Sequence, residues 1–410
     1  MRIGIIGGGA AGMMSAALLY EKDHENRIGE IVLFECNTVL GRKLALTGGG
    51  RCNVTTGNFD IAEVLKNYPR GANFLKKSIY DFSPKHVFDW FRSHGVKLKV
   101  EEDRRVFPVT DNSSDIIDVF LNIYKNPKTK IKKSPVIDMW KEMDRFAVRL
   151  HDEIHLFDKV IMATGGGYNT NSGIINYGYA FAQKFGHKIT KLAPGLTSLE
   201  TNDCDIHTLK GITLSNIKLR FLKKDEHVFN GSCVFTHKGL SGPGIFAISS
   251  LSAFENYDES DPALLLLDLL PEENFENLKH NLEQTRLNSP AKKISNLISN
   301  FIPKSLAEIM LKKLKINDKK SSEVSAKDLN RIIDSIKNFQ VVITGRISGS
   351  EFVTAGGVDL NEVDAATMES KLVKGLHFAG EILNIDGFTG GYNLQCAWST
   401  AHAAAIGITK

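Results

Sequence analysis

The stretch that decides the fold is Met1–Glu35, which reads MRIGIIGGGAAGMMSAALLYEKDHENRIGEIVLFE. It contains a short apolar run at Met1–Ile6, the glycine motif G-x-G-x-x-G in GGGAAG, and an alanine-rich segment of helical character that ends near Tyr20. A second apolar run, Ile31–Phe34, leads directly into the acid Glu35. A strand, a glycine turn, a helix, a second strand and an acid in this order are typical of a dinucleotide-binding unit.

Each glycine of the motif has a physical reason. Gly7 permits a tight turn, Gly9 lets a pyrophosphate approach the backbone, and Gly12 lets the helix pack closely on the sheet. The helix N-terminus offers free N–H groups and a partial positive charge to phosphates. Glu35 can accept hydrogen bonds from ribose hydroxyls, and its charge disfavours a 2′-phosphate. The residues expected at the nucleotide are Gly7, Gly9, Ala10, Ala11, Gly12 and Glu35; the alternative is a glycine-rich turn without a ligand.

Composition indicates an ordinary globular protein. With 410 residues the chain is long enough for two or three domains, and its net charge of +4 identifies no partner. Five cysteines without C-x-x-C spacing argue against a structural metal or a redox disulfide and fit a reducing compartment. No signal peptide and no apolar run of about 18 residues is present, so we expect a cytoplasmic protein that does not span a membrane.

The pattern along the chain predicts an α/β fold, a Rossmann-like nucleotide-binding domain built from both chain ends. Short β-type runs follow one another in the middle of the chain, and a helical pattern of Leu and Ile with intervening Lys comes after them. They predict an inserted β-barrel-like part and a small helical bundle. The expected segments are 1–194 (nucleotide-binding), 195–270 (β-rich), 271–338 (helical), 339–345 (return strand) and 346–410 (nucleotide-binding).

A second glycine-rich cradle lies near the C-terminus, in GLHFAGE (Gly375–Glu381) and in the turn that ends with TGGYN. The helix that begins near Gly390–Asn393 could point its N-terminus at the pyrimidine edge of a flavin and stabilise negative charge there. Glu381 is placed to bond the ribityl hydroxyls. The alternative is a glycine-rich loop that caps an ordinary helix. Tyr392 and Trp398 could pack near the flavin ring or simply in the core.

Six blocks of sequence, together with these two glycine-rich segments, resemble the two-dinucleotide-binding-domain flavoproteins, and more narrowly the YhiN/BaiN-like (aminoacetone-oxidase-like) NAD(P)/FAD-dependent oxidoreductases. The resemblance implies FAD at the first motif and a β-barrel-like and helical insert. One departure is Arg104, which stands where the family pattern favours Gly. The blocks are Gly41–Thr55, Arg105–Ile116, Phe235–Ile245, Val353–Val358, Thr367–Lys371 and Gly380–Ala397.

The loop TGGGRCN follows Arg42 and Lys43 in the first of these blocks. Its glycines bring backbone amides close to a ligand, and Arg51 can bind a phosphate or a flavin carbonyl. Lys43 could lie by the flavin ring, although a solvated surface is the alternative for Arg42 and Lys43. Cys52 is either a small buried filler or the proton donor of an alkene reduction. This loop adds Arg42, Lys43, Gly49, Gly50, Arg51, Cys52 and Asn53 to the expected FAD site.

The remaining expected FAD contacts come from the middle and the end of the chain. The catalytic candidates are Cys52, Lys43 and His237, and a structural histidine is the alternative for His237. No metal site is expected. The remaining FAD contacts are Val136, Thr164, Gly165, Gly380, Glu381, Asp386, Gly390, Gly391, Tyr392 and Asn393.

Only one G-x-G-x-x-G motif is present, so NAD(P)H is expected to dock transiently as electron donor, unless the substrate itself supplies the electrons. Three activities follow. The first is NAD(P)H-dependent reduction of an activated C=C bond in an enone-like small molecule or in a uridine of ribosomal RNA, both of which the family resemblance includes. The second is an aminoacetone-like amine oxidase that produces hydrogen peroxide. The third is a nucleic-acid-binding module with a structural flavin.

Two basic segments bear on the RNA alternative. Residues 288–337 contain eleven lysines or arginines against five acids, a net charge of +6, and residues 125–133 contain five lysines and no acid. Clustered charge of this kind can follow the phosphates of a nucleic acid. A solvated lysine-rich face is the alternative explanation. The sequence predicts no oligomeric state.

Overall fold

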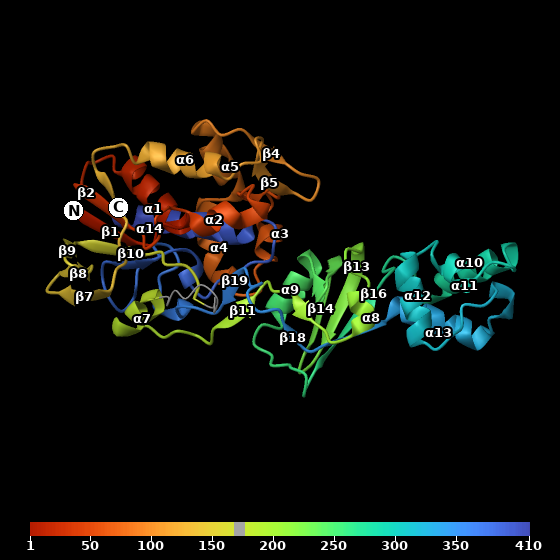
Figure 1. Ribbon diagram of the computed structural model, residues 1–410. Coiled ribbons are helices and arrows are strands. Elements are labelled where there is room, and N and C mark those ends of the chain that lie inside the picture. The colour runs from red at the N-terminus through yellow and green to blue at the C-terminus, as the bar shows by residue number, and fades with distance from the viewer. Residues whose placement is uncertain (168–176) are drawn as a thin grey trace. The chain divides into compact units, whose positions relative to one another are not determined.

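The computed structural model describes residues 1–167 and 177–410 (Figure 1). The described chain divides into two compact units. Unit 1 comprises Met1–Pro194 and Val353–Lys410, and unit 2 comprises Gly195–Phe352. Each unit has its own hydrophobic core.

Unit 1 is built on a five-stranded parallel sheet in the order β20-β10-β1-β2-β6. The central strands are continuous apolar runs, as expected for parallel strands that are buried on both faces. β20 comes from the C-terminal part of the chain and pairs with β10 from the N-terminal part. The strands are β1 (Arg2–Ile6), β2 (Glu30–Phe34), β6 (Thr129–Lys132), β10 (Lys159–Met162) and β20 (Leu376–Phe378).

Two long helices from opposite ends of the chain, α1 (Ala10–Lys22) and α14 (Tyr392–Thr409), pack against each other beside this sheet (Figure 1). Both are rich in alanine and buried over most of their length, and small side chains allow this close approach. The shorter helices of unit 1 are α2 (Arg42–Leu46), α3 (Ile61–Leu65), α4 (Ala72–Asp81), α5 (Pro84–Ser93), α6 (Ser114–Ile123) and α7 (Tyr177–Lys184).

Two small antiparallel sheets complete unit 1. The first, in the order β3-β5-β4, carries the segment that follows the TGGGRCN loop, and the second has the order β7-β8-β9. Short 3-10 turns η1 (Thr47–Gly49), η3 (Leu360–Glu362) and η4 (Gly380–Ile382) lie in loops. The strands are β3 (Thr55–Thr56), β4 (Leu98–Val100), β5 (Arg105–Pro108), β7 (Asp138–Glu142), β8 (Arg145–Arg149) and β9 (Ile154–Phe157), and the pair β11 (Ala193–Gly195) and β19 (Val353–Ala355) lies where the two units join in sequence.

Unit 2 contains a seven-stranded antiparallel sheet in the order β17-β16-β13-β14-β15-β12-β18. Its alternating buried and exposed positions, clearest in β17, fit a sheet with one face in the core. The strands are β12 (Leu199–Glu200), β13 (Thr213–Leu222), β14 (Glu226–Phe235), β15 (Gly239–Ser241), β16 (Ala263–Asp268), β17 (Phe339–Ile343) and β18 (Gly345–Arg346).

Helices of unit 2 share one core with this sheet. α9 packs on β14, and α13 packs on β16 and β17. α13 is strongly amphipathic, because Leu329, Ile332, Ile333 and Ile336 form its buried face. The helical elements are α8 (Cys204–His207), α9 (Pro243–Leu251), α10 (Phe275–Asn288), α11 (Ile294–Ile298), α12 (Lys304–Lys313), η2 (Ser321–Glu323) and α13 (Ala326–Lys337).

The predicted α/β fold class, with a parallel sheet built from both chain ends, is confirmed. The strands of the β part form an open sheet with edges at β17 and β18, and no pairing among the described residues closes it into a barrel. No helix in the described ranges combines the length and apolarity that a membrane crossing requires. Across the same ranges no group of three or more His, Cys, Asp or Glu residues could hold a metal ion.

Candidate dinucleotide site at the strand ends

The loops that follow three neighbouring strands of the parallel sheet lie at one edge of it, because the carboxyl ends of parallel strands meet there. These loops are Gly7–Gly9 after β1, Thr164–Gly166 after β10 and Gly380–Glu381 after β20. We call these three loops, together with Glu35 after β2, the strand-end site. They are tightly packed, since a Cβ added at Gly7 would lie 2.4 Å from the carbonyl oxygen of Ala163.

The three glycines of the motif have the geometry that a dinucleotide site requires. Gly7 has φ +109°, in the left-handed region that favours glycine. A Cβ added at Gly12 would lie 1.8 Å from the carbonyl oxygen of Gly7, so α1 can approach the turn only because this residue is Gly. A Cβ added at Gly9 would meet nothing within 4 Å. The backbone at Gly9 therefore faces open space, where the pyrophosphate is expected.

Polar groups beside this space are unsatisfied within the described chain. The N-cap of α1, Gly9, makes no side-chain cap bond, so the first N–H groups of a 13-residue helix remain available to an anion. The hydroxyl of Thr164 is buried and has no hydrogen-bond partner among the described residues. A phosphate-bearing ligand would satisfy such groups. The residues present therefore fit the pyrophosphate of FAD.

Glu35 is held rigidly at the end of β2. Its side chain is buried, with 7% exposure, and Oε2 accepts the N–H of Gly8 at 2.8 Å. The other oxygen, Oε1, accepts the N–H of Asn37 at 2.7 Å, the side-chain amide of Asn37 at 2.5 Å and the thiol of Cys36 at 3.4 Å. Each carboxylate oxygen has about two acceptor positions, so Oε2 is the oxygen that retains one for a ribose hydroxyl.

Glu381 joins the two ends of unit 1. Its Oε2 accepts from Lys43 Nζ at 2.6 Å, across 338 residues of sequence, and its Oε1 accepts the N–H of Thr354 at 2.9 Å. A Cβ added at Gly166 would lie 2.5 Å from Oε1 of Glu381. Burial, followed by the negative charge of Glu381, raises the pKa of Tyr179, whose buried hydroxyl has no partner among the described residues.

The N-terminus of α14 lies against the segment that follows the TGGGRCN loop. Gly390 and Gly391 have φ of +123° and +91°, and a Cβ added at Gly391 would lie 2.4 Å from the carbonyl carbon of Thr55. Gly391 caps α14 without a side-chain bond, so this 18-residue helix also has available N–H groups. Gly380 adds a close contact, because its Cβ would lie 2.8 Å from Cβ of Ala11 in α1. The first turn of α1 therefore lies at Gly380 of the strand-end site, and α14 reaches Gly380 through Thr400, whose hydroxyl accepts the N–H of Gly380 at 2.9 Å.

The TGGGRCN loop has an unusual backbone. Gly48, Gly49 and Gly50 have φ of +60°, +71° and +90°, and Cys52 has φ +62°. A Cβ added at Gly49 or Gly50 would meet nothing within 4 Å, so the backbone of both is accessible. Cys52 is the exception to the glycine pattern, because a left-handed conformation is uncommon for a residue with a side chain.

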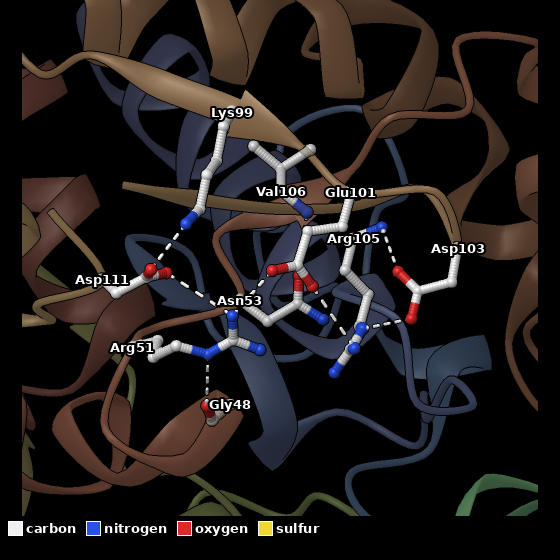
Figure 2. A network of polar contacts seen from close by, with 9 residues as sticks. All are labelled: Gly48, Arg51, Asn53, Lys99, Glu101, Asp103, Arg105, Val106 and Asp111. Carbon is white, nitrogen blue, oxygen red and sulfur yellow. Dashed lines mark hydrogen bonds and ion pairs between the residues drawn. The ribbon is translucent and has the colours of Figure 1, made fainter. Parts of the chain in front are cut away.

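Arg51 is held by acids on the β3-β5-β4 sheet side of the loop (Figure 2). Its Nη1 donates to Glu101 at 2.7 Å and lies 3.4 Å from Oδ1 of Asp111, and the guanidinium stacks 3.8 Å from the centre of the Phe107 ring. Lys99 also binds Asp111, at 2.5 Å. In this structure Arg51 thus anchors the loop, and its expected contact with a phosphate or a flavin carbonyl stays a prediction.

Cys52 and Asn53 are both enclosed. The thiol of Cys52 is fully buried, and burial raises its pKa to about 12. Cys52 therefore stays protonated at neutral pH, but its sulfur is not exposed to a ligand in this conformation. Asn53 is 8% exposed, and its Oδ1 accepts the N–H of Val106 at 3.3 Å. Arg42 is exposed and donates to Asn37 at 3.2 Å.

Two of the C-terminal candidates stabilise the turn before α14. Asp386 is fully buried and forms a bidentate pair with Arg70, in which Nη2 lies 2.5 Å from Oδ2. Asn393 accepts the N–H of Gly387 at 2.9 Å and donates to its carbonyl at 2.7 Å. Both side chains therefore fix the backbone that leads to Gly390 and Gly391.

Four other candidates pack in the interior of unit 1 or belong to unit 2. Trp398 is fully buried and donates to the carbonyl of Val54 at 2.9 Å, so it packs in the core. Val136 is buried before β7, and Tyr392 makes an edge contact with Tyr68. His237 belongs to unit 2, where it is exposed in the turn after β14, whereas the other site candidates belong to unit 1.

Three functional candidates were not apparent from the sequence. Thr354 and Tyr179 contact or face Glu381, and Arg70 pairs with Asp386. The sequence could have pointed to Thr354, because this residue comes shortly before the pair Gly356–Gly357 in the VTAGGV block. No local pattern marks Tyr179 or Arg70, because their partners are distant in the sequence.

The parallel sheet, the glycine turn, the acid after β2 and the two uncapped helix N-termini define a Rossmann-type FAD-binding domain of the FAD-dependent oxidoreductase class. The chain belongs to the family described as HI0933-like protein Rossmann domain, whose model matches residues 1–407. The predicted family resemblance and FAD as the cofactor are thereby confirmed.

Two relatives match over almost the whole chain. The ribosomal RNA dihydrouridine synthase of Escherichia coli (strain K12) is 28% identical over 406 residues, with 98% of this chain and 96% of the relative covered. A 3-dehydro-bile acid delta(4,6)-reductase of Clostridium scindens (strain ATCC 35704 / DSM 5676 / VPI 13733 / 19) is 27% identical over 408 residues, with 98% of both covered. A Mycobacterium smegmatis Sdh1 complex in the apo form is similar in fold, with a TM-score of 0.50 and 14% identity over 100% of this chain and 68% of that chain.

Proposed function

We propose that this protein uses NAD(P)H to reduce a C=C bond conjugated to a carbonyl, with a uridine of ribosomal RNA as its substrate. The observation that carries the proposal is the match of 98% of the chain to two enzymes whose names describe such a reduction. Dihydrouridine is uridine with its ring C=C bond saturated, and this bond is conjugated to a carbonyl. The two relatives thus share one reaction class on different substrates.

The cofactor is held by residues at the strand-end site. The open backbone at Gly9 and the N-terminus of α1 bind the pyrophosphate, and Glu35 accepts from ribose hydroxyls. Glu381 would bond the ribityl chain, and the N-terminus of α14 would stabilise negative charge at the pyrimidine edge. The chemistry that FAD would supply when bound is hydride transfer from NAD(P)H to the substrate carbon.

Lys43 is the catalytic candidate that the geometry favours for the proton. Its side chain is 62% exposed, and its ammonium group is oriented by Glu381 at 2.6 Å. An exposed, oriented ammonium can hold a proton beside the substrate carbon next to the one that accepts hydride. Cys52 could do so only after a movement that exposes its sulfur.

NAD(P)H is proposed as a transiently docked donor, because the chain has one G-x-G-x-x-G motif and that motif is assigned to FAD. A ribosomal RNA substrate also favours a cytoplasmic location.

Rapid mixing under anaerobic conditions tests the reaction class. We expect NADH or NADPH to bleach the flavin band of the holoenzyme, and ribosomal RNA lacking dihydrouridine to restore it, with dihydrouridine as product. Bleaching by a small amine but by neither nicotinamide, with peroxide formed in air, would identify an amine oxidase instead. Flavin reduced by NAD(P)H but reoxidised only by an enone steroid would identify a small-molecule reductase. RNA binding without any turnover would identify the protein as a nucleic-acid-binding module in which the flavin is structural.

A further inference from the structure

We propose that four lysines in the helical part of unit 2 form a binding surface for RNA phosphates. The inference rests on the proposed RNA substrate and assigns to it a docking surface made of residues that do not belong to the cofactor site. We call this surface the lysine ribbon; it consists of Lys292, Lys293, Lys319 and Lys320.

Two short segments, one before α11 and one before η2, bring these lysines together. Lys293 and Lys320 are directly opposite each other in an antiparallel bridge. On either side of them, the N–H of Ile294 donates to the carbonyl of Lys319 at 3.0 Å, and the N–H of Ser321 donates to the carbonyl of Lys292 at 2.8 Å. Backbone bonds therefore fix a spacing between lysines that lie 27 residues apart in the sequence.

The backbone beside the ribbon lysines is held by a further set of hydrogen bonds, which Asp318 accepts. Asp318 accepts from the N–H of Ser295 at 3.1 Å and from its hydroxyl at 2.9 Å. These bonds tie the residue before Lys319 to the first turn of α11. The two segments are thereby held in place independently of the lysine side chains.

Most of the other basic residues of the helical part are paired with acids. Lys304, Lys312, Lys313, Arg331 and Lys337 each have a carboxylate within 4.0 Å. Lys315 and Lys327 form no ion pair with a described residue, but no backbone bridge brings them together as it does the ribbon lysines.

On the ribbon, Lys293 lies 3.5 Å from Asp318. Lys292, Lys319 and Lys320 form no ion pair with any residue that the structure describes. Like charges that face each other across a strand pair are destabilising, so the facing charges of Lys293 and Lys320 do not stabilise this bridge.

In the second basic segment of the sequence, by contrast, most lysines are paired with acids. In residues 125–133, three lysines are neutralised inside unit 1: Lys128 by Asp23, Lys130 by Glu30 and Lys132 by Glu153. That segment is a salt-bridged edge of the parallel sheet. The ribbon is therefore the better candidate for phosphates.

Counterion release gives the expected size of the effect. Each phosphate contact contributes about −0.7 to −0.9 to the slope of log K against log salt. Four contacts therefore account for a slope of about −3, and for a loss in affinity of roughly 50- to 150-fold between 50 and 200 mM salt.

The test compares two variants with the same change in charge. In the ribbon variant, Lys292, Lys293, Lys319 and Lys320 are all replaced by Gln. The control variant is K66Q/K77Q/K85Q/K130Q, which changes four exposed lysines of unit 1 that form ion pairs with neighbouring acids. The probe is deproteinised ribosomal RNA from an Escherichia coli strain that lacks its ribosomal RNA dihydrouridine synthase. Binding to each FAD-loaded protein is measured between 50 and 200 mM salt.

We expect the ribbon variant to bind this RNA at least tenfold more weakly at 50 mM salt, with a salt slope reduced in magnitude by about 3. The control variant should keep most of the wild-type affinity, and both variants should retain flavin and its reduction by NAD(P)H. Equal affinity and slope in the two variants would overturn the ribbon as a binding surface.

The outcomes separate this inference from the proposed function. If the ribbon variant binds RNA and forms dihydrouridine as the wild type does, only the ribbon assignment fails. If the wild-type protein neither binds nor modifies ribosomal RNA, both fail. Binding to vesicles of phosphatidylserine and phosphatidylcholine that depends on the ribbon, with no binding to RNA, would assign it to an anionic lipid surface and overturn the RNA assignment.

Discussion

The space beside the α-carbons of Gly9 and Gly12 differs, and this makes the two residues a matched pair for testing the cofactor site. Gly9→Ala places a methyl group in open space, at φ −79°, which Ala adopts freely. Gly12→Ala places one 1.8 Å from the carbonyl oxygen of Gly7. We expect Gly9→Ala to leave the stability of the apoprotein unchanged and to lose at least tenfold in FAD affinity. Gly12→Ala should lose about 3 kcal/mol in the free energy of unfolding.

Urea unfolding of both apoproteins and titration with FAD measure these two quantities. A Gly9→Ala protein with wild-type FAD affinity would show that the pyrophosphate does not approach this backbone.

The role of Lys43 in the reaction can be tested without destabilising the protein. The side chain is 62% exposed, so removal of its charge in Lys43→Met should change the free energy of unfolding by less than about 1 kcal/mol. We expect reoxidation of the reduced flavin by substrate to slow at least tenfold, while reduction by NAD(P)H changes little. Stopped-flow measurement of the two half-reactions separates them, with Lys66→Met, which breaks an exposed pair with Glu63, as control. Equal slowing of both half-reactions would assign Lys43 to cofactor binding and not to the proton.

The buried thiol of Cys52 predicts a pH dependence of stability. Burial raises its pKa from 9.0 to about 12 in the folded protein. Above pH 9 the unfolded thiol loses its proton while the folded thiol keeps it, so the free energy of unfolding falls as the pH rises. The slope is about 1.4 kcal/mol per pH unit for each such thiol. Urea unfolding between pH 8.5 and 11 should therefore give a steeper decline for the wild type than for Cys52→Ala, and parallel curves would contradict the burial.

Single residues also show what local sequence can and cannot predict. The roles of Gly7, Gly9 and Gly12 follow from steric rules that act within one turn of chain, and the geometry observed at each of them fits those rules. Arg51 could not be predicted, because its orientation depends on Glu101 and Asp111, which are 50 and 60 residues away.

At the scale of elements, the buried pair between Arg70 and Asp386 joins the turn before α4 to the turn before α14. Asp386 is fully buried, and removal of its charge leaves a partly buried guanidinium without its main carboxylate. We expect Asp386→Asn to lower the free energy of unfolding by about 3 kcal/mol. Lys77→Met, which breaks an exposed pair with Asp81, should change it by less than about 1 kcal/mol. Equal effects in urea unfolding would show that the pair carries little of the stability of these turns.

The elements themselves were predictable where their pattern is local. β1, β2 and β10 are continuous apolar runs, and the amphipathic spacing in α13 is plain in the sequence. The order of strands in unit 2 was not predictable, because its pairings join segments such as β12 and β18 that lie far apart in the chain. A barrel-like part was expected from the many short strands, and the pairings of the described strands give an open sheet.

At the scale of the whole molecule, unit 1 is assembled from both ends of the chain. β20 pairs with β10, α14 packs on α1, and Glu381 binds Lys43, so the cofactor site exists only after the ends have met. The lysine ribbon of unit 2 likewise depends on a long-range bridge. Composition indicated the net charge of this region, but only the backbone contacts show which lysines lie together.

The most direct test of the proposed function is mass spectrometry of ribosomal RNA from a strain in which the gene for this protein has been deleted. We predict that one dihydrouridine is lost from the RNA, that the wild-type chain restores it, and that the Gly12→Ala chain does not. An unchanged dihydrouridine content in the deleted strain would contradict the proposal that this flavoprotein reduces a uridine of ribosomal RNA.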